Sequence, residues 1–145
     1  NEKYSHLQLE YDNLLCSCDG GESDRAGKPT SEKRKFPSFC DNKKNNQILP
    51  LTPLDPTCED QFSYDEEGNI YGMTDNASEA IKILGLDCSP LVNARRQVIN
   101  PYVTMNMDND GWFAVIENLQ KRHNGDFLPF CFAVISYIKR FKIAV

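Results

Sequence analysis

The chain has 145 residues, of which 40% are hydrophobic and 26% charged, with a formal net charge of -5 and a pI near 5.0. This composition predicts one globular domain and excludes a wholly disordered chain, and the acidic charge argues against nucleic acid as the main partner, because phosphate binding needs a basic surface. No stretch of about 20 apolar residues occurs, so the sequence predicts no transmembrane helix.

Residues 1–18 are expected to form an N-terminal helix. Tyr4, Leu7, Tyr11 and Leu14 recur at alternating spacings of three and four, which is the buried stripe of an amphipathic helix. The same spacing is the seam of a coiled coil, but two heptads are too few to favour that alternative.

Residues 19–57 predict an irregular, basic loop that continues into an extended segment. The first part is rich in Gly, Ser, Pro and charge, and the prolines of "ILPLTPLDPTC" prevent a regular helix. Its basic residues form either a patch for an anionic partner, such as a sulfated glycan or an acidic protein face, or solvated loop charge. They are Arg25, Lys28, Lys33, Arg34, Lys35, Lys43 and Lys44.

Residues 58–145 are expected to form a compact α+β core. The pattern of "QFSYDEEGNIYGM" predicts a short hairpin. "NASEAIKILGL" predicts a helix that is capped by Asn76 or Ser78 and ends at Gly85. "SPLVNARRQVI" predicts another helix, with Pro90 in its first turn and Pro101 limiting its length.

The stretch "TMNMDNDGWFAV", residues 104–115, allows two interpretations. An EF-hand calcium loop has oxygen ligands at positions 1, 3 and 5, Gly at 6 and Glu at 12. Asn106, Asp108, Asp110, Gly111 and Glu117 occupy these positions. A calcium loop also needs a helix on either side, whereas "YVTMNM" and "WFAVI" are rich in β-forming residues. We therefore predict a β-hairpin with "DNDG" at its corner and keep an EF-hand-like loop at 106–117 as the alternative.

Residues 101–127, "PYVTMNMDNDGWFAVIENLQKRHNGDF", resemble a stretch of fibrinogen-like domains in which a strand ends in an acidic turn before a Trp-bearing strand. The similarity is carried by Met107, Asp108, Asp110, Gly111, Trp112, Val115, Gly125, Asp126 and Phe127. The sequence departs from the family at Asn106, where the family has a cysteine. The resemblance implies a hairpin and an extracellular setting, and it carries over no binding residues.

The C-terminal stretch "FLPFCFAVISYIKRFKIAV" is the most apolar part of the chain. Its β-branched and aromatic content predicts a central strand, although periodicity alone leaves a buried helix open. A helix on a membrane surface, with Lys139, Arg140 and Lys142 on its polar side, is a further alternative.

The cysteines are six in number, namely Cys16, Cys18, Cys40, Cys58, Cys88 and Cys131. An even set predicts three disulfides and an oxidising compartment, with 15 possible pairings left open. Reduced thiols in a cytosolic protein are the alternative, and zinc is disfavoured because "CSC" lacks the usual ligand spacing. The triplet Asn76-Ala77-Ser78 fits the N-glycosylation pattern and favours the same setting.

The sequence contains no nucleophile elbow, P-loop, Rossmann glycine fingerprint or His-Glu-x-x-His motif, so an enzyme is not expected. Because the chain starts at Asn1 and not at Met, we expect a processed or excised piece, such as an ectodomain fragment. The expected fold is a small disulfide-stabilised α+β domain with an N-terminal helix, a long irregular loop and a mainly antiparallel sheet with one or two helices. The expected function is extracellular binding or assembly with a protein partner, without a cofactor unless the calcium interpretation holds.

Overall fold

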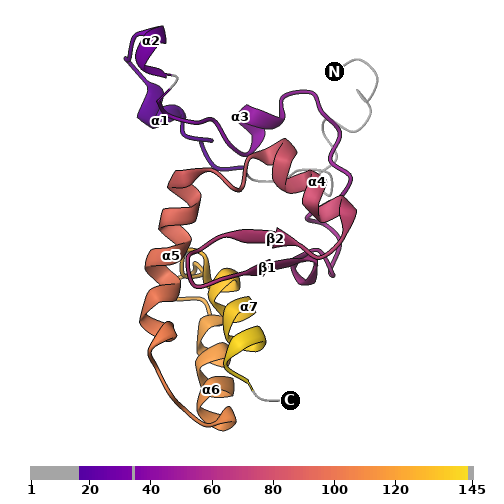
Figure 1. The fold of residues 1–145 in the computed structure, drawn as a ribbon, viewed down its shortest axis with the longest axis vertical. Coiled ribbons are helices and arrows are strands. Elements are labelled where there is room, and N and C mark those ends of the chain that lie inside the picture. The colour runs from indigo at the N-terminus through magenta and orange to yellow at the C-terminus, as the bar shows by residue number, and fades with distance from the viewer. Residues whose placement is uncertain (1–16, 34, 144–145) are drawn as a thin grey trace.

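The computed structural model describes residues 17–33 and 35–143, and shows helices together with a small antiparallel sheet (Figure 1). The elements are α1 (Glu22–Arg25), α2 (Thr30–Lys33), α3 (Asp41–Lys44), the 3-10 helix η3 (Glu59–Gln61), β1 (Phe62–Tyr64), β2 (Ile70–Gly72), α4 (Asp75–Leu84), α5 (Ser89–Val103), α6 (Asn109–Leu119) and α7 (Cys131–Phe141). The α+β prediction is thus confirmed in outline and the sheet is antiparallel, but the described residues contain more helices than the one or two that the sequence predicts. The predicted N-terminal helix, Cys16 and Arg34 lie outside the described residues.

The hairpin of β1 and β2 is confirmed, with Phe62 opposite Gly72 and Tyr64 opposite Ile70. Its turn is held by the carboxylate of Asp65, which accepts hydrogen bonds of 2.8 Å from the backbone N–H of Asn69 and 2.7 Å from the hydroxyl of Tyr71. These bonds outweigh the effect of burial and lower the pKa of Asp65. The charged carboxylate therefore stabilises the turn.

Helix α4 is also confirmed, but its cap differs from the prediction. The side chain of Thr74, and not that of Asn76 or Ser78, accepts the hydrogen bond from Ala77 N at 3.2 Å. An N-cap residue must have non-helical backbone angles, and Thr74 is the extended residue that precedes the helix. Gly85 ends α4 in the left-handed conformation, with φ of 63°, as the sequence predicts.

Helix α5 begins with Pro90 in its first turn and ends at Val103, just beyond Pro101. It carries Arg95, a buried charged side chain that is 3% exposed. The Nε of Arg95 donates to the carbonyl of Gly68 at 2.7 Å, and its Nη2 donates to the carbonyl of Leu86 at 2.8 Å. This one side chain therefore joins the hairpin turn to the segment that connects α4 with α5.

The hairpin predicted at "DNDG" is wrong, because this stretch begins helix α6. Asp108 is the N-cap, and its carboxylate accepts a hydrogen bond from Gly111 N at 2.9 Å. Trp112, Ile116 and Leu119 follow at helical spacing and are buried. The cap and the buried stripe together outweigh the β-propensity of "WFAVI", because packing routinely overrides propensity.

The central strand predicted in the C-terminal stretch is also wrong, because residues Cys131–Phe141 form helix α7. This helix packs against β1, α5 and α6 (Figure 1) and buries Cys131, Ala133, Val134, Ile135, Tyr137 and Ile138. Its apolar side is therefore occupied by the protein core, which also argues against the membrane-surface alternative. No helix in the described ranges is long and apolar enough to cross a membrane.

Two groups of buried side chains form the core. The larger group is Ile99, Trp112, Ile116, Leu119, Cys131, Ala133, Val134, Ile135, Tyr137 and Ile138, from helices α5, α6 and α7. The smaller group is Leu51, Ala77 and Ala80, beneath α4. Strand β1 lies between them, since Tyr64 packs against the larger group and Phe62 against the smaller one.

Candidate functional site

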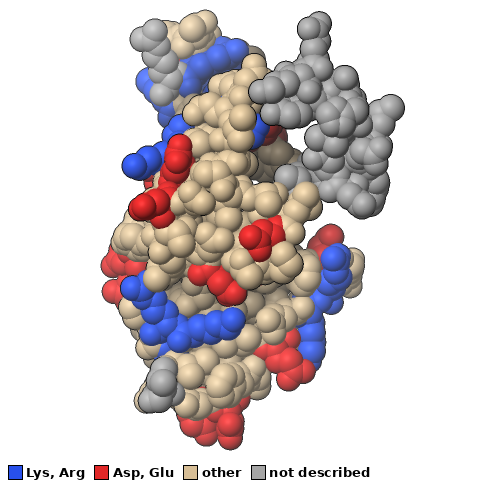
Figure 2. All heavy atoms as spheres, turned by 90° about the vertical axis from the view of Figure 1, so that its right-hand side faces the viewer, with Lys and Arg blue, Asp and Glu red and all other residues tan. Residues whose placement is uncertain are grey.

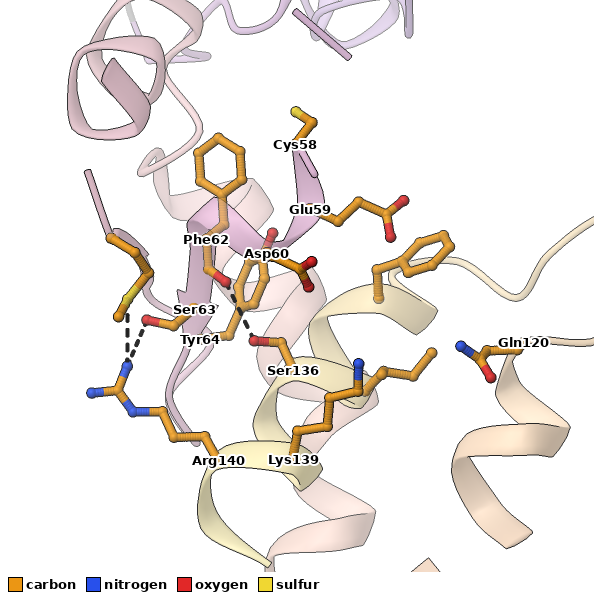
Figure 3. Close-up of a pocket in the computed structure, with 13 residues that line it drawn as sticks. Cys58, Glu59, Asp60, Phe62, Ser63, Tyr64, Gln120, Ser136, Lys139 and Arg140 are labelled. Atoms are coloured by element: carbon orange, nitrogen blue, oxygen red, sulfur yellow. Dashed lines mark hydrogen bonds between the residues drawn. The ribbon is translucent and has the colours of Figure 1, made fainter. Parts of the chain in front are cut away.

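A surface hollow of about 490 Å³ lies between η3, β1 and α7. Its volume falls within the range of small-ligand and anchor pockets, roughly 300–1,000 Å³. The apolar lining comes from Phe62, Tyr64, Met73, Phe132 and Ile135. Figure 3 shows that acidic side chains of η3 lie above the hollow and basic side chains of α7 below it. The site therefore combines an apolar wall with charges of both signs.

The wall formed by β1 and α7 is fixed by hydrogen bonds. Arg140 Nη1 donates to the hydroxyl of Ser63 at 2.8 Å and also lies 3.9 Å from Met73 Sδ. The hydroxyl of Ser136 donates to the carbonyl of Phe62 at 3.5 Å (Figure 3). Arg140 is thus engaged within the protein and holds the wall in place.

The acidic edge of the hollow consists of Glu59 and Asp60 on η3. Burial and the neighbouring charge of Asp60 raise the pKa of Glu59, while the positive charge of Lys139 opposes this shift. The carboxylates of this edge therefore disfavour one another's charge. A cation placed beside them would stabilise both.

An exposed apolar surface adjoins the hollow. We call residues 127–132 the aromatic loop; it comprises the end of the connection from α6 to α7 and the first two residues of α7, and it exposes Phe127 (40% exposed), Leu128, Phe130 and Phe132. The ring of Phe132 lines the hollow and lies 5.9 Å, centroid to centroid, from the ring of Phe127. The hollow and the aromatic loop therefore form one continuous apolar surface, a feature that marks interaction sites.

The predicted calcium ligands do not form an EF-hand loop. Asp108 caps α6, whereas Asp110 and Glu117 lie on the helix itself, where the pattern requires an irregular loop up to its last position. Glu117 forms an exposed ion pair with Lys121 at 3.0 Å, and Asn106 is an exposed residue before the cap. Across residues 17–33 and 35–143, no group of three or more acidic, His or Cys side chains could hold a metal ion. Helix α6 thus occupies most of 106–117, where the alternative interpretation requires a loop, and calcium binding itself stays a prediction.

The predicted basic patch is divided between two places. Arg25 and Lys33 line a second hollow of about 290 Å³ together with Glu22. Figure 2 shows Lys and Arg side chains gathered at the end of the molecule where α1 and α2 lie. Lys43 and Lys44 belong to α3 instead, and Lys28 lies over the ring of Phe36, 3.8 Å from its centroid. Lys35 is exposed after α2.

Cys18, Cys40, Cys58, Cys88 and Cys131 are free thiols in the structure. The Sγ atoms of Cys18 and Cys40 lie 3.0 Å apart. Cys131, at the start of α7, is buried in the larger core group. Disulfide formation stays a prediction for the set as a whole.

Asn76 of the predicted glycosylation triplet is exposed in the first turn of α4. The next residue, Ala77, is fully buried against the smaller core group. The side chain that would carry a glycan is thus accessible, and its modification stays a prediction.

Sequence reasoning did not identify the hollow. Glu59 and Asp60 are far from Phe132 and Lys139 along the chain, and only the fold brings them together. Lys139 was considered only as part of a membrane-surface helix. The available signal was the density of aromatic residues in "FLPFCF", which a sequence alone does not distinguish from a core segment. Comparisons with protein-family models, with curated proteins and with solved structures gave no match.

Proposed function

We propose that the protein is a non-enzymatic binding module that takes a segment of a protein partner into the hollow between η3, β1 and α7. One observation carries this proposal. Phe132 both lines the hollow and contacts Phe127, so the hollow opens directly onto an exposed aromatic surface. Protein interfaces are built in this way, with aromatic side chains and a filled pocket at their centre.

The charges around the hollow favour a partner segment that carries an apolar side chain beside a Lys or Arg. The apolar side chain would fill the space lined by Phe62 and Ile135. The basic residue would lie against Glu59 and Asp60, where the mutual repulsion of the carboxylates favours a cation. The net charge of -5 also speeds the approach of a basic partner.

The proposed setting is extracellular, with disulfides that stabilise the domain. The even number of cysteines supports this setting, as does the accessible Asn76 in an N-glycosylation triplet. If the protein is a structural subunit, the same apolar surface would join it to the other members of a larger complex.

Selection from a random peptide-display library tests the partner proposal. We expect the protein to enrich peptides in which a large apolar residue stands next to a Lys or Arg. Reversing one charge of the acidic edge, Glu59→Lys, is expected to weaken the selected peptides at least tenfold, because it replaces an attraction by a repulsion. Affinity is measured by fluorescence anisotropy of labelled peptides.

Glu79→Lys is the matched control, because Glu79 is an exposed acidic residue on α4 and does not line the hollow. It introduces the same charge change into the same protein. Equal loss of affinity in the two variants would show that only net charge matters, and peptides without a common apolar-basic pattern would refute the hollow as the site.

The end of the molecule formed by α1 and α2 supports a second candidate function, the binding of an anionic partner such as a sulfated glycan. The Nε atom of Arg25 is buried without a hydrogen-bond partner beside the second hollow, which Lys33 also lines. A sulfate group would supply the missing acceptor. We expect the double variant Arg25→Ser, Lys33→Ser to elute from a heparin column at lower salt than the control Lys82→Ser, Lys121→Ser. Identical elution of the two variants would assign retention to net charge alone.

A further inference from the structure

We infer that Cys18 and Cys40 form a disulfide that closes the segment containing α1 and α2. Their Sγ atoms lie 3.0 Å apart and the two residues are 22 positions apart in the sequence. A disulfide bond is close to 2.05 Å long, so its formation needs an approach of only about 1 Å.

The two cysteines are brought together by contacts that do not involve sulfur. The backbone N–H of Phe39 donates to the carbonyl of Gly20 at 3.2 Å, and the side-chain amide of Asn42 donates to the carbonyl of Asp19 at 2.6 Å. The backbone N–H of Cys40 also donates to the carbonyl of Leu84 at 2.7 Å, which fixes it to the end of α4. The segments on either side of the sulfur pair therefore lie side by side before any bond forms.

Gly20 makes this approach possible. Its φ is +59°, and a Cβ atom at this position would lie 2.5 Å from the carbonyl oxygen of Phe39. Any larger residue would push the segment of Cys18 away from that of Cys40. Glycine is therefore required at position 20 by the close approach of Phe39, which the sequence alone does not reveal.

The environments of the two thiols suit a defined order of reaction. Cys18 is exposed, whereas burial raises the pKa of Cys40 to about 12, with further contributions from the contact with Cys18 and from nearby Cys88. Cys18 therefore meets the oxidant first. An external small-molecule disulfide such as oxidised glutathione serves as the oxidant.

The thiolate of Cys18 attacks one sulfur of the oxidant, breaks its S–S bond and releases one glutathione thiol. The sulfur of Cys40 then attacks that of Cys18, its proton passes to the departing sulfur, and a second glutathione thiol leaves. The protein loses two protons and two electrons in total, and the oxidant gains them. Cys88 is the competing partner for Cys40, because it is close enough to contribute to the shift of that thiol's pKa.

The inferred bond extends the proposal of an extracellular setting. Only the persistence of the bond in the organism depends on that setting. Its chemistry is independent of the hollow and of any partner. If the Cys18–Cys40 link is found but no common peptide pattern is selected, only the partner proposal is refuted. If a peptide pattern is selected but the link is absent, only the disulfide inference is refuted.

The test is disulfide mapping of the full chain after equilibration in a buffer of oxidised and reduced glutathione. Free thiols are blocked, the protein is digested without reduction, and linked peptides are identified by mass spectrometry. The variant Cys16→Ser is mapped in parallel, because Cys16 and Cys18 would share a peptide. We expect a Cys18–Cys40 link in both proteins. A link from Cys40 to Cys88 or Cys16, or blocked thiols at Cys18 and Cys40, would overturn the inference.

A thermal measurement supplies a second readout. Oxidation is expected to raise the Tm of the protein by about 5–10 °C, because the bond removes freedom from the unfolded chain. Cys18→Ser, at an exposed position, should abolish most of this increase, while Cys58→Ser should retain it. Equal increases in both variants would contradict a dominant Cys18–Cys40 bond.

Discussion

Replacement of Trp112 by alanine is expected to lower the free energy of unfolding by about 3–5 kcal/mol. Trp112 is 1% exposed and is among the largest fully buried side chains of the described residues. It lies on α6 in the larger core group, where it packs with side chains of α5 and α7 such as Ile99 and Ile138. Alanine would leave a cavity among three helices that cannot all move inward, so both the lost burial and the cavity reduce stability.

The effect is measured by urea denaturation followed by circular dichroism, since the variant loses the tryptophan signal. Domains of this size are stable by only about 5–15 kcal/mol, so the variant should unfold at much lower urea. Phe113→Ala is the matched control, because the neighbouring ring is 53% exposed. Its effect should stay near or below about 1 kcal/mol. A Trp112 variant as stable as the Phe113 variant would contradict the helical position of this stretch.

Replacement of Arg95 by alanine is expected to lower the free energy of unfolding by about 2–4 kcal/mol. The guanidinium of Arg95 supplies the hydrogen bonds to the carbonyls of Gly68 and Leu86 that are described above. Removing it leaves the two carbonyl acceptors without these donors, at a cost of about 1–3 kcal/mol each. This cost outweighs the free energy gained because the positive charge of Arg95 no longer has to be buried.

Hydrogen exchange locates the effect as well as measuring it. We expect the amides of the hairpin turn around Gly68 to lose protection before those of α6 and α7. Arg96→Ala is the control, since Arg96 is exposed and donates only to Asn93 among the contacts described. If both variants were equally stable, Arg95 would not connect the hairpin to α5.

The elements that sequence reasoning identified are those with local signals. The hairpin carries a Gly-Asn turn between alternating residues, and α4 carries a polar start and a glycine end. For α5, Pro90 marks the start because its missing N–H is not needed in the first turn. These features act within a few residues, so they can be read without knowledge of the fold.

The two elements that were predicted as strands owe their helical form to packing. In α7, the residues from Cys131 to Ile138 are nearly all apolar, and the polar face that indicates a helix is carried by Ser136, Lys139 and Arg140 toward its end. In α6, the residues "WFAVI" favour a strand, whereas the N-cap Asp108 just before them favours a helix. The packing of Trp112, Ile116 and Leu119 in the larger core group favours the helix.

The candidate site was less predictable than the fold. The hollow combines residues 58–64 with residues 132–140, and neither segment carries a motif. Its geometry depends on the docking of α7 against β1, the feature that propensity predicted wrongly. In contrast, an even set of cysteines was visible at once, but the proximity of Cys18 and Cys40 follows from a backbone contact at Gly20.

The division of the core into two groups has a consequence for cooperativity. The smaller group buries little apolar surface, chiefly Leu51, Ala77 and Ala80, whereas the larger one unites three helices. Sub-global opening should therefore release α4 and the preceding segment while α5, α6 and α7 remain folded. Strand β1 packs against both groups through Tyr64 and Phe62, so together with Arg95 it sets how far the protein unfolds as a single unit.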